Sequence, residues 1–275
     1  MVVKDVIYMG KVISAWSATK KTGKTVLLYM LISNLIKQID NKTKVLVCCS
    51  NLNYGNLLNL FEISGDELNI EDIVNYKISP DNKFNMTKAL AQRDNIYFLG
   101  SKKTSMAYVS RNIKEYEKLV EDFRQTFDLV IFDTISGHEN ILTNMLLDKS
   151  DYIINVISQD KEILDTTDFI TSKELAFVVN SYKDIYPDIG ELKSLYKINN
   201  VFEVPDCKEL QQMKNRGQLA YYPQYETEYN KAINDVSEFI AKKLKLVITS
   251  THPVKKSIQQ GFLDLIRRGT HDWFK

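Results

Sequence analysis

The feature that most constrains this sequence is a Gly-Lys-Thr triplet, Gly23 to Thr25, which stands between two apolar segments. Residues 11–16 (KVISAW) before it are mostly apolar, as in a short buried strand. Residues 24–39 have apolar side chains at helical spacing and on all sides, which predicts a well-buried helix. The sequence therefore predicts a strand, a tight loop and a helix in immediate succession.

Residues 18–25 (ATKKTGKT), here named the phosphate loop, fit the pattern G-x-x-x-x-G-K-[ST] except that Ala18 replaces the first glycine. In such loops, backbone N–H groups surround phosphates at a helix N-terminus, where the helix dipole favours anions. Gly23 would allow close approach, Lys24 would reach the β- and γ-phosphates, and the Thr25 hydroxyl would bind Mg²⁺. The alternative is a lysine-rich loop that only caps the helix. The loop residues predicted to contact ATP are Lys20, Lys21, Thr22, Gly23, Lys24 and Thr25.

Apolar runs alternate with longer segments of helical periodicity along most of the chain. A second helix is predicted at residues 111–127, and residues 64–85 are polar and are predicted to form a loop. Several runs are apolar at every position, which is typical of strands buried on both faces of a parallel sheet. The alternation predicts an α/β fold with a doubly wound, mostly parallel sheet flanked by helices on both faces. Further strands are predicted at residues 44–50, 95–99, 128–133, 151–158, 175–180 and 201–204.

A second acidic element supports the phosphate loop. The segment FDLVIFDT, residues 127–134, reads as an apolar strand that ends in Asp133. In proteins with a phosphate-binding loop, a carboxylate in this place holds Mg²⁺ through a water. Many strands end in aspartate, so the argument depends on the two features occurring together. His138 follows in the next loop, where a solvent-facing side chain is favoured over a sensor of the γ-phosphate.

The bulk composition excludes several classes of protein. Apolar residues make up 44% of the chain and charged residues 26%, as in ordinary globular proteins. A net charge of +1 provides no global field that would attract nucleic acid. Cys48, Cys49 and Cys207 form no disulfide framework, and neither they nor the histidines have metal-ligand spacing. No apolar stretch reaches the roughly 18 residues that cross a bilayer, and no signal peptide is evident, so the expected compartment is the cytoplasm.

These segments resemble the MinD/ParA family of P-loop ATPases, including the TadZ-type members of pilus-assembly systems, from about residue 11 to residue 246. Besides the phosphate loop and FDLVIFDT, the resemblance rests on residues 50–57 (SNLNYGNL), on VVN ending in Asn180, and on Val204-Pro205-Asp206 followed by Asn215-Arg216-Gly217. It implies a P-loop NTPase fold that binds ATP and Mg²⁺ and forms a homodimer. It also implies that Asn180 hydrogen-bonds the adenine and that the backbone of Pro205 and Asp206 lies beside the ring. The alternative for Asn180 is the polar end of a strand.

The phosphate loop departs from the family pattern K-G-G-x-G-K-T. The first lysine of that pattern reaches across a dimer to the partner's nucleotide, and here Thr19 replaces it. Lys20 and Lys21 occupy the two glycine positions. Either lysine is a candidate substitute, the alternative being general attraction of phosphate. Side chains in place of two glycines are expected to strain the loop.

The end of the second predicted strand departs from the family as well. The family has aspartates there, and the later one helps to position the attacking water. In this sequence Cys49 and Asn51 occupy those positions, and no acidic residue occurs between residues 44 and 60. An amide cannot accept a proton, although Asn51 could still orient a water. The resemblance therefore implies a degenerate ATPase that binds nucleotide with slow or absent hydrolysis.

The sequence divides into a P-loop ATPase-like domain at residues 1–246 and an amphipathic extension at residues 247–275. Apolar side chains share one helical face in residues 258–266, and basic pairs flank that face. A basic amphipathic helix can lie on a membrane surface, so residues 255–275 are a candidate for peripheral attachment at the inner face of a membrane. The favoured alternative is a helix packed on its own domain or on a dimer partner.

The sequence favours a nucleotide-dependent switch or scaffold that positions a cellular machine through a protein partner. The machines considered are pilus, secretion, conjugation and division complexes. One alternative is a ParA-like plasmid or chromosome partition ATPase that binds DNA non-specifically, which a net charge near zero does not favour. Another is a scaffold of the same fold that works without nucleotide. A metabolic enzyme would need a second catalytic constellation, and the sequence contains none that we recognise.

Overall fold

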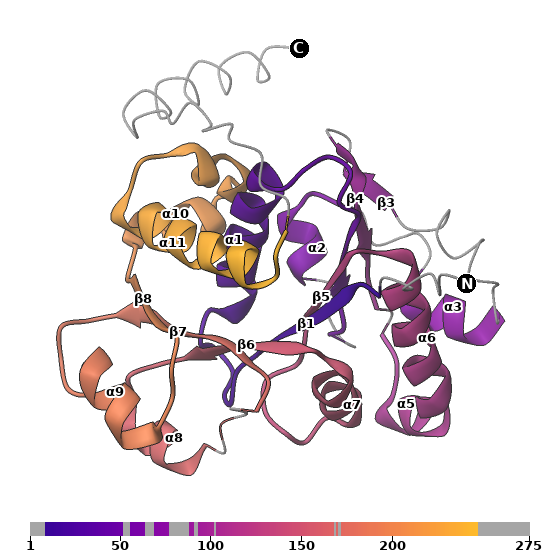
Figure 1. The fold of residues 1–275 in the computed structure, drawn as a ribbon, viewed down its shortest axis with the longest axis horizontal. Helices are drawn as coiled ribbons and strands as arrows, with labels where there is room; N and C mark the ends of the chain where they lie inside the picture. The colour runs from indigo at the N-terminus through magenta and orange to yellow at the C-terminus, as the bar shows by residue number, and fades with distance from the viewer. Residues whose placement is uncertain are drawn as a thin grey trace, which may run out of the picture.

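The computed structural model describes residues 9–51, 56–63, 69–76, 88–90, 93–101, 103–167, 169 and 172–246. Over these ranges, helices cover both faces of one eight-stranded sheet (Figure 1). All neighbouring strands pair in parallel except β3, which is antiparallel to β4 at one edge. This confirms the predicted doubly wound, mostly parallel α/β fold. The strands in spatial order are β3 (Lys88–Leu90), β4 (Arg93–Leu99), β2 (Val45–Cys49), β5 (Leu129–Asp133), β1 (Lys11–Trp16), β6 (Tyr152–Ile157), β7 (Glu174–Tyr182) and β8 (Val201–Pro205).

The helices divide into two layers on opposite faces of the sheet. In Figure 1 one layer lies above the sheet, and the other, here called the lower layer, extends from below the sheet to its right. The layer above the sheet consists of α1 (Lys24–Gln38), α2 (Asn56–Leu60), α10 (Lys208–Asn215), the 3₁₀ helix η1 (Leu219–Gln224) and α11 (Glu228–Lys243). The lower layer consists of α3 (Ile70–Tyr76), α5 (Met106–Arg111), α6 (Ile113–Thr126), α7 (Ile141–Lys149), α8 (Lys161–Thr166) and α9 (Ile189–Tyr196).

Alternation along the strands supplies both layers with a core. In β1, Ile13 and Ala15 face the α1 layer, whereas Val12 and Trp16 face the opposite layer. Because successive side chains of a strand point to opposite faces, a strand covered on both sides is apolar at nearly every position. The burial of all five residues of β2 and of β5 follows from this arrangement.

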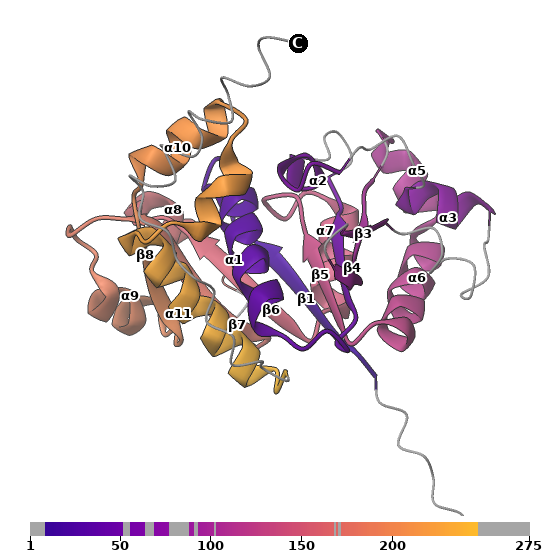
Figure 2. The ribbon, with the colours of Figure 1, turned by 90° about the horizontal axis from the view of Figure 1, so that it is seen from above.

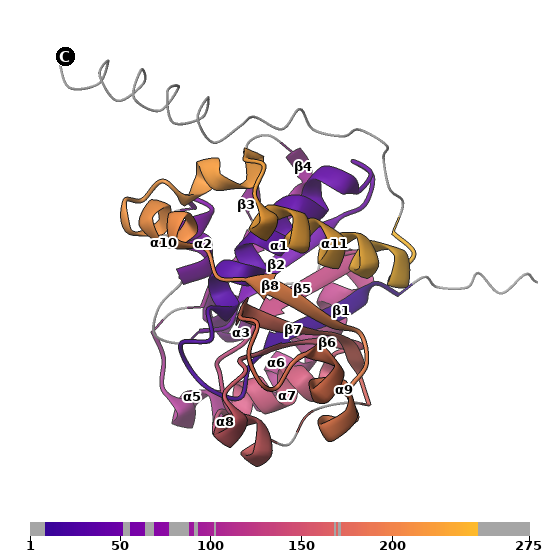
Figure 3. The same cartoon turned by 90° about the vertical axis from the view of Figure 1, so that its left-hand side faces the viewer.

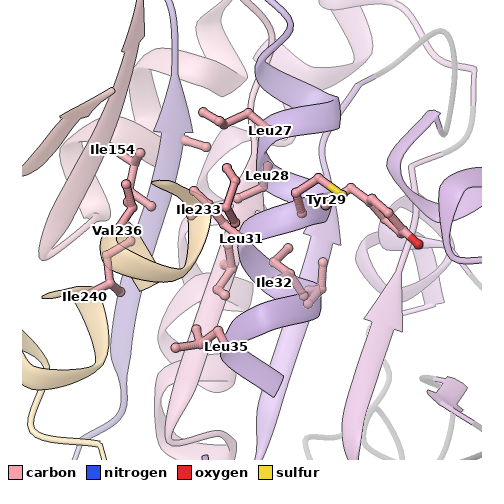
Figure 4. Close-up of a cluster of buried hydrophobic side chains, with 14 of the residues drawn as sticks. Leu27, Leu28, Tyr29, Leu31, Ile32, Leu35, Ile154, Ile233, Val236 and Ile240 are labelled. Carbon is pink, nitrogen blue, oxygen red and sulfur yellow. The ribbon is translucent and has the colours of Figure 1, made fainter. Parts of the chain in front are cut away.

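Helix α1 is the most enclosed helix of the upper layer, and Figure 2 shows it between α11 and α2. Viewed from the β8 edge in Figure 3, α1 and α11 lie together on one face of the sheet. Each fully buried leucine or isoleucine contributes about 1.5–3 kcal/mol of transfer free energy. The helix that follows the phosphate loop is therefore firmly anchored. The residues that make this contact include Leu27, Leu28, Leu31, Ile32 and Leu35 of α1, Ile154 of β6, and Ile233, Val236 and Ile240 of α11 (Figure 4).

Two elements differ from the prediction. Helix α3 lies inside residues 64–85, which were predicted to form a loop, and it buries Ile70, Ile73 and Val74 against the lower core. Polar neighbours hid this apolar spacing in the sequence, and one of them, Glu71, is also buried, where the hydroxyls of Ser101 and Tyr116 donate to its carboxylate. Strand β3 has three residues, too few to show a periodicity.

The extension at residues 247–275 lies outside the described residues, so the amphipathic helix and its attachment to a membrane stay predictions. Within the part of the chain that the structure describes, no helix has the length and apolar character needed to cross a bilayer.

Candidate functional site

The phosphate loop connects β1 to α1 at the carboxyl end of the sheet. Strand β1 lies between β5 and β6, with β2 and β4 beyond β5 and with β7 and β8 beyond β6. The chain therefore fills one side of β1 first and then crosses to the other. Ligands of open α/β sheets bind outside the carboxyl ends of the strands at such a switch point.

Three of the predicted site residues meet at this point. The Lys24 ammonium group donates to one carboxylate oxygen of Asp133 and to the carbonyl oxygen of Thr134. The Thr25 hydroxyl donates to the other oxygen of Asp133 at 3.0 Å. The side chains of Lys24 and Asp133 are 6% and 4% exposed, so their ion pair is buried. The fold thus joins the phosphate loop to the acidic end of β5, 109 residues along the chain.

The N-terminus of α1 is left open. Its N-cap is Gly23, which makes no side-chain cap, and its first turn contains no acidic residue. By contrast, α5, α7, α8, α9 and α11 each begin with a side chain that accepts a hydrogen bond from the helix backbone. Helices α6 and α10 also lack a side-chain cap, but each has a glutamate in its first turn. The first N–H groups of a helix need partners, and its dipole favours an anion there. This end of α1 is therefore suited to a phosphate group.

The loop backbone adopts the left-handed conformation at two residues. Gly23 has a φ of 78°, which glycine adopts freely. Lys21 has a φ of 66°, in one of the two places where the family has glycine. A lysine in this region carries a strain of about 1–2 kcal/mol. The side chains of Lys20 and Lys21 are exposed.

The segment after β5 contacts Trp16 and Ser17, the two residues that precede the phosphate loop, and the sequence did not reveal these contacts. The N–H of Gly137 donates to the carbonyl oxygen of Ser17 at 2.9 Å, and the hydroxyls of Ser17 and Ser136 are 2.8 Å apart. The indole N–H of Trp16 donates to the carbonyl oxygen of Gly137 at 3.1 Å. The exposed His138 ring lies against Trp16, with 4.5 Å between the ring centroids. In the sequence, these residues are marked only by their places next to the phosphate loop and next to the segment FDLVIFDT.

The end of β2 presents neutral groups to the same site. Cys49 is fully buried and pairs in register with Asp133 of β5. Burial, together with the negative charge of Asp133, raises the pKa of the Cys49 thiol to about 11, so the thiol is neutral at physiological pH. Asn51, which the resemblance predicts to occupy the position of the hydrolytic aspartate, is half-buried just beyond this strand end. Residues 52–55 of the resembling segment lie outside the described residues.

The residues predicted to lie beside the adenine are at the carboxyl ends of β7 and β8, on the other side of the loop. Asn180 of β7 pairs in register with Val204, the half-buried Pro205 ends β8, and the exposed Asp206 follows it. The Asn180 side chain donates to the carbonyl oxygen of Thr22 at 2.7 Å. The structure therefore brings all three residues to the carboxyl end, and it adds a contact between Asn180 and the phosphate loop.

The donor set fits Mg²⁺ bound together with a nucleotide. Mg²⁺ prefers hard oxygen ligands and is held by one or two carboxylates together with substrate phosphates. The Thr25 hydroxyl and the Asp133 carboxylate are such ligands, and they lie within hydrogen-bond distance of each other. The described residues contain no group of three or more His, Cys, Asp or Glu side chains that could hold a metal ion on their own. Phosphate oxygens would therefore have to complete the site.

Comparisons with known proteins show which solved structures have a similar fold. No protein-family model matches the sequence, and no curated protein matches it either. Among solved structures, MinD from Pyrococcus horikoshii OT3 in complex with Mg-ADP superposes with a TM-score of 0.67 at 17% identity, covering 86% of this chain and 97% of that chain. A ParA family ATPase from Chlorobium tepidum TLS has a TM-score of 0.65 at 15% identity, covering 83% and 98%.

A third structure is a putative plasmid partition protein from Borrelia burgdorferi B31 bound to AMPPNP. It has a TM-score of 0.62 at 16% identity and covers 86% of this chain and 99% of that chain. At these identities the likeness establishes the fold alone. The chain has the α/β fold of the MinD and ParA ATPases, and its phosphate loop connects β1 to α1.

Proposed function

We propose that this protein binds Mg-ATP as a MinD/ParA-like switch. The observation that carries this proposal is the meeting of Lys24, Thr25 and Asp133 at the uncapped N-terminus of α1. A buried ion pair of this kind often gives no more stability than well-packed apolar residues in its place. The pair lies beside an open helix N-terminus, which suits a site where ligand groups replace it. Phosphate would then pair with Lys24, and Mg²⁺ would pair with Asp133. Two solved proteins of the same fold carry nucleotides, Mg-ADP in one and AMPPNP in the other, which supports this ligand class.

We further propose that turnover is weak or absent. The neighbouring strand β2 ends in the neutral thiol of Cys49, and the carboxamide of Asn51 follows it. Neither group is a general base at neutral pH, because a thiol with a pKa of about 11 holds its proton and an amide accepts none. Under this proposal, the protein binds ATP and either hydrolyses it slowly and releases ADP, or releases the ATP unchanged.

The output of the switch is proposed to be a homodimer that engages a protein partner of a localisation or assembly machine, as in TadZ-type proteins. Ile185 and Tyr186, which follow β7, are 54% and 56% exposed at the carboxyl end of the sheet. The Gln159 amide donates to the carbonyl oxygens of Lys183, Ile185 and Pro187, and its oxygen accepts from the N–H of Lys183. Two exposed apolar side chains on a loop held in place in this way suit a protein interface. A MinD from Aquifex aeolicus with the same fold was solved in complex with MinC.

Titration with a fluorescent ATP analogue and Mg²⁺ tests the proposal. Lys24→Ala should weaken binding by about 30-fold or more, because a charge-assisted hydrogen bond to phosphate contributes roughly 2–3 kcal/mol. Lys231→Ala, which removes an exposed lysine from α11, is the matched control and should bind as the wild-type protein does. Light scattering in the same samples should show a mass increase with nucleotide that Lys24→Ala lacks. Absence of saturable binding by the wild-type protein would refute the proposal.

A further inference from the structure

The side chain of Asn180 makes a contact that the end of a strand does not require. Its Nδ2 donates to the carbonyl oxygen of Thr22 at 2.7 Å, across 158 residues of sequence. Next to it, Ser181 has a φ of 57°, and the pairing of β7 with β8 shifts register between Asn180 and Tyr182. Irregularities of this kind redirect side chains at the rim of a sheet. Here the redirected amide meets the phosphate loop.

The same amide lies directly on Gly23. A Cβ atom built on Gly23 would be 2.4 Å from Nδ2 of Asn180, closer than any side chain can be. The φ of 78° favours glycine at this position, and any larger residue would also have to displace the Asn180 side chain. The contact lies at the N-cap of α1, where an anion would bind.

The hydrogen bond fixes the direction of the peptide that joins Thr22 to Gly23. In a trans peptide the C=O and the N–H point in opposite directions. Because the Thr22 carbonyl points at Asn180, the N–H of Gly23 points away from it. This N–H precedes the first N–H groups of α1, which have no intrahelical acceptor. One side-chain amide thus sets the orientation of a backbone donor at the open end of the helix.

We propose that Asn180 is a positioning residue for the phosphate chain of the ligand, and that it acts by holding the Thr22–Gly23 peptide in its anion-binding orientation. This inference rests on the proposed function. It differs from recognition of adenine, because the side chain acts through the loop and affects a ligand without a base. A carboxamide has two N–H donors and one oxygen acceptor. The contact with Thr22 therefore leaves a donor and the oxygen for other partners.

Calorimetric titration with Mg-ATP and with Mg-tripolyphosphate, which has no base, tests the inference. Asn180→Ala should weaken both ligands by the same factor, about fivefold for the loss of one neutral hydrogen bond. Asn180→Asp should weaken both further, because its carboxylate faces the Thr22 carbonyl and a polyanion. The ratio of the two affinities should stay at the wild-type value. Asn199→Ala, at an exposed residue before β8 and away from the loop, is the matched control and should change neither affinity.

The outcomes separate the inference from the function on which it rests. A wild-type protein that binds neither ligand would refute both. Weaker Mg-ATP binding with unchanged tripolyphosphate binding in Asn180→Ala would overturn the inference alone, since Asn180 would then act on the base. Hydrogen exchange without ligand gives a second readout. The amides of residues 17–26 should exchange faster in Asn180→Ala at an unchanged midpoint of thermal unfolding, and unchanged exchange would count against the inference.

Discussion

Two adjacent strand ends face the same site and differ in chemistry. Strand β5 ends in Asp133, a buried carboxylate that holds Lys24 and Thr25. Strand β2, its hydrogen-bonded neighbour, ends in Cys49, which occupies the same level of the sheet. The first end presents charged groups suited to phosphate and Mg²⁺, and the second presents a neutral thiol, which the carboxamide of Asn51 follows. Under the proposed function, these two strand ends separate nucleotide binding from turnover.

The two ends also show that the sheet itself does not require charge at this position. Cys49 is fully buried as a neutral, apolar-like side chain. Breaking the buried Lys24–Asp133 pair by removing one partner typically costs about 3–5 kcal/mol, whereas an apolar pair of similar volume there would be tolerated. A requirement for stability therefore does not explain the ion pair. The proposed function explains the ion pair, because phosphate and Mg²⁺ would take the place of the internal partners of Lys24 and Asp133.

Asn51→Asp should produce the largest effect, because it places a carboxylate where the neutral strand end lacks one. A positioned general base accelerates a reaction by roughly 10²–10⁴-fold, so we expect ATP turnover to rise by about a hundredfold over the wild-type protein. Steady-state phosphate release measures it. Asn59→Asp, the same change at an exposed residue of α2, is the control and should leave turnover unchanged.

Two results would break the comparison between the strand ends. The first is equal turnover in wild type and Asn51→Asp, which would mean that Asn51 does not occupy the hydrolytic position. The second is rapid hydrolysis by the wild-type protein that Lys24→Ala abolishes, which would mean that the site needs no carboxylate from β2.

Asp133→Asn should have the next largest effect and tests the charged strand end. Its amide no longer holds Lys24 by charge, so Lys24 becomes available to phosphate. In EDTA, which removes Mg²⁺, the variant should therefore bind ATP about tenfold more tightly than the wild-type protein. The increase in affinity when Mg²⁺ is added should be smaller than in wild type by a similar factor. Asp128→Asn, which alters a hydrogen bond to the Lys44 N–H at the opposite end of β5, should bind as wild type. An equal loss of affinity with and without Mg²⁺ would contradict the proposed competition.

The sequence predicted the core of the fold because the decisive signals are local. The strand before the phosphate loop, the loop itself and the apolar helix after it are contiguous, and each buried strand is apolar along its own length. The short helix α3 was missed because its three apolar residues lie among polar neighbours. The wrongly predicted region was thus one in which tertiary packing, not periodicity, decides the structure.

Contacts between distant segments were beyond the reach of sequence patterns. The pairing of Lys24 with Asp133 was foreseeable because both belong to known motifs at the ends of neighbouring strands. The contact of Asn180 with Thr22 depends on a register shift between β7 and β8, and nothing in the residues around Asn180 encodes it. The contact between Trp16 and Gly137 is of the same kind, since it follows from the pairing of β1 with β5.

Lys21→Gly should have the smallest effect, and it tests the departure of the loop from the glycine-rich pattern that it resembles. Lys21 has a φ of 66°, so glycine would relieve about 1–2 kcal/mol of strain at a cost of about 0.5–1 kcal/mol in backbone entropy. Urea unfolding should therefore show a gain of about 0.5–1 kcal/mol, at an unchanged dependence on denaturant. Lys20 keeps a negative φ, so Lys20→Gly is the matched control and should lose about 0.5–1 kcal/mol of stability.

The nucleotide affinity of Lys21→Gly decides the role of the Lys21 side chain. A change within about twofold assigns this side chain a general attraction of phosphate. A loss beyond about tenfold assigns it a direct contact with the ligand, in place of the lysine that Thr19 replaces.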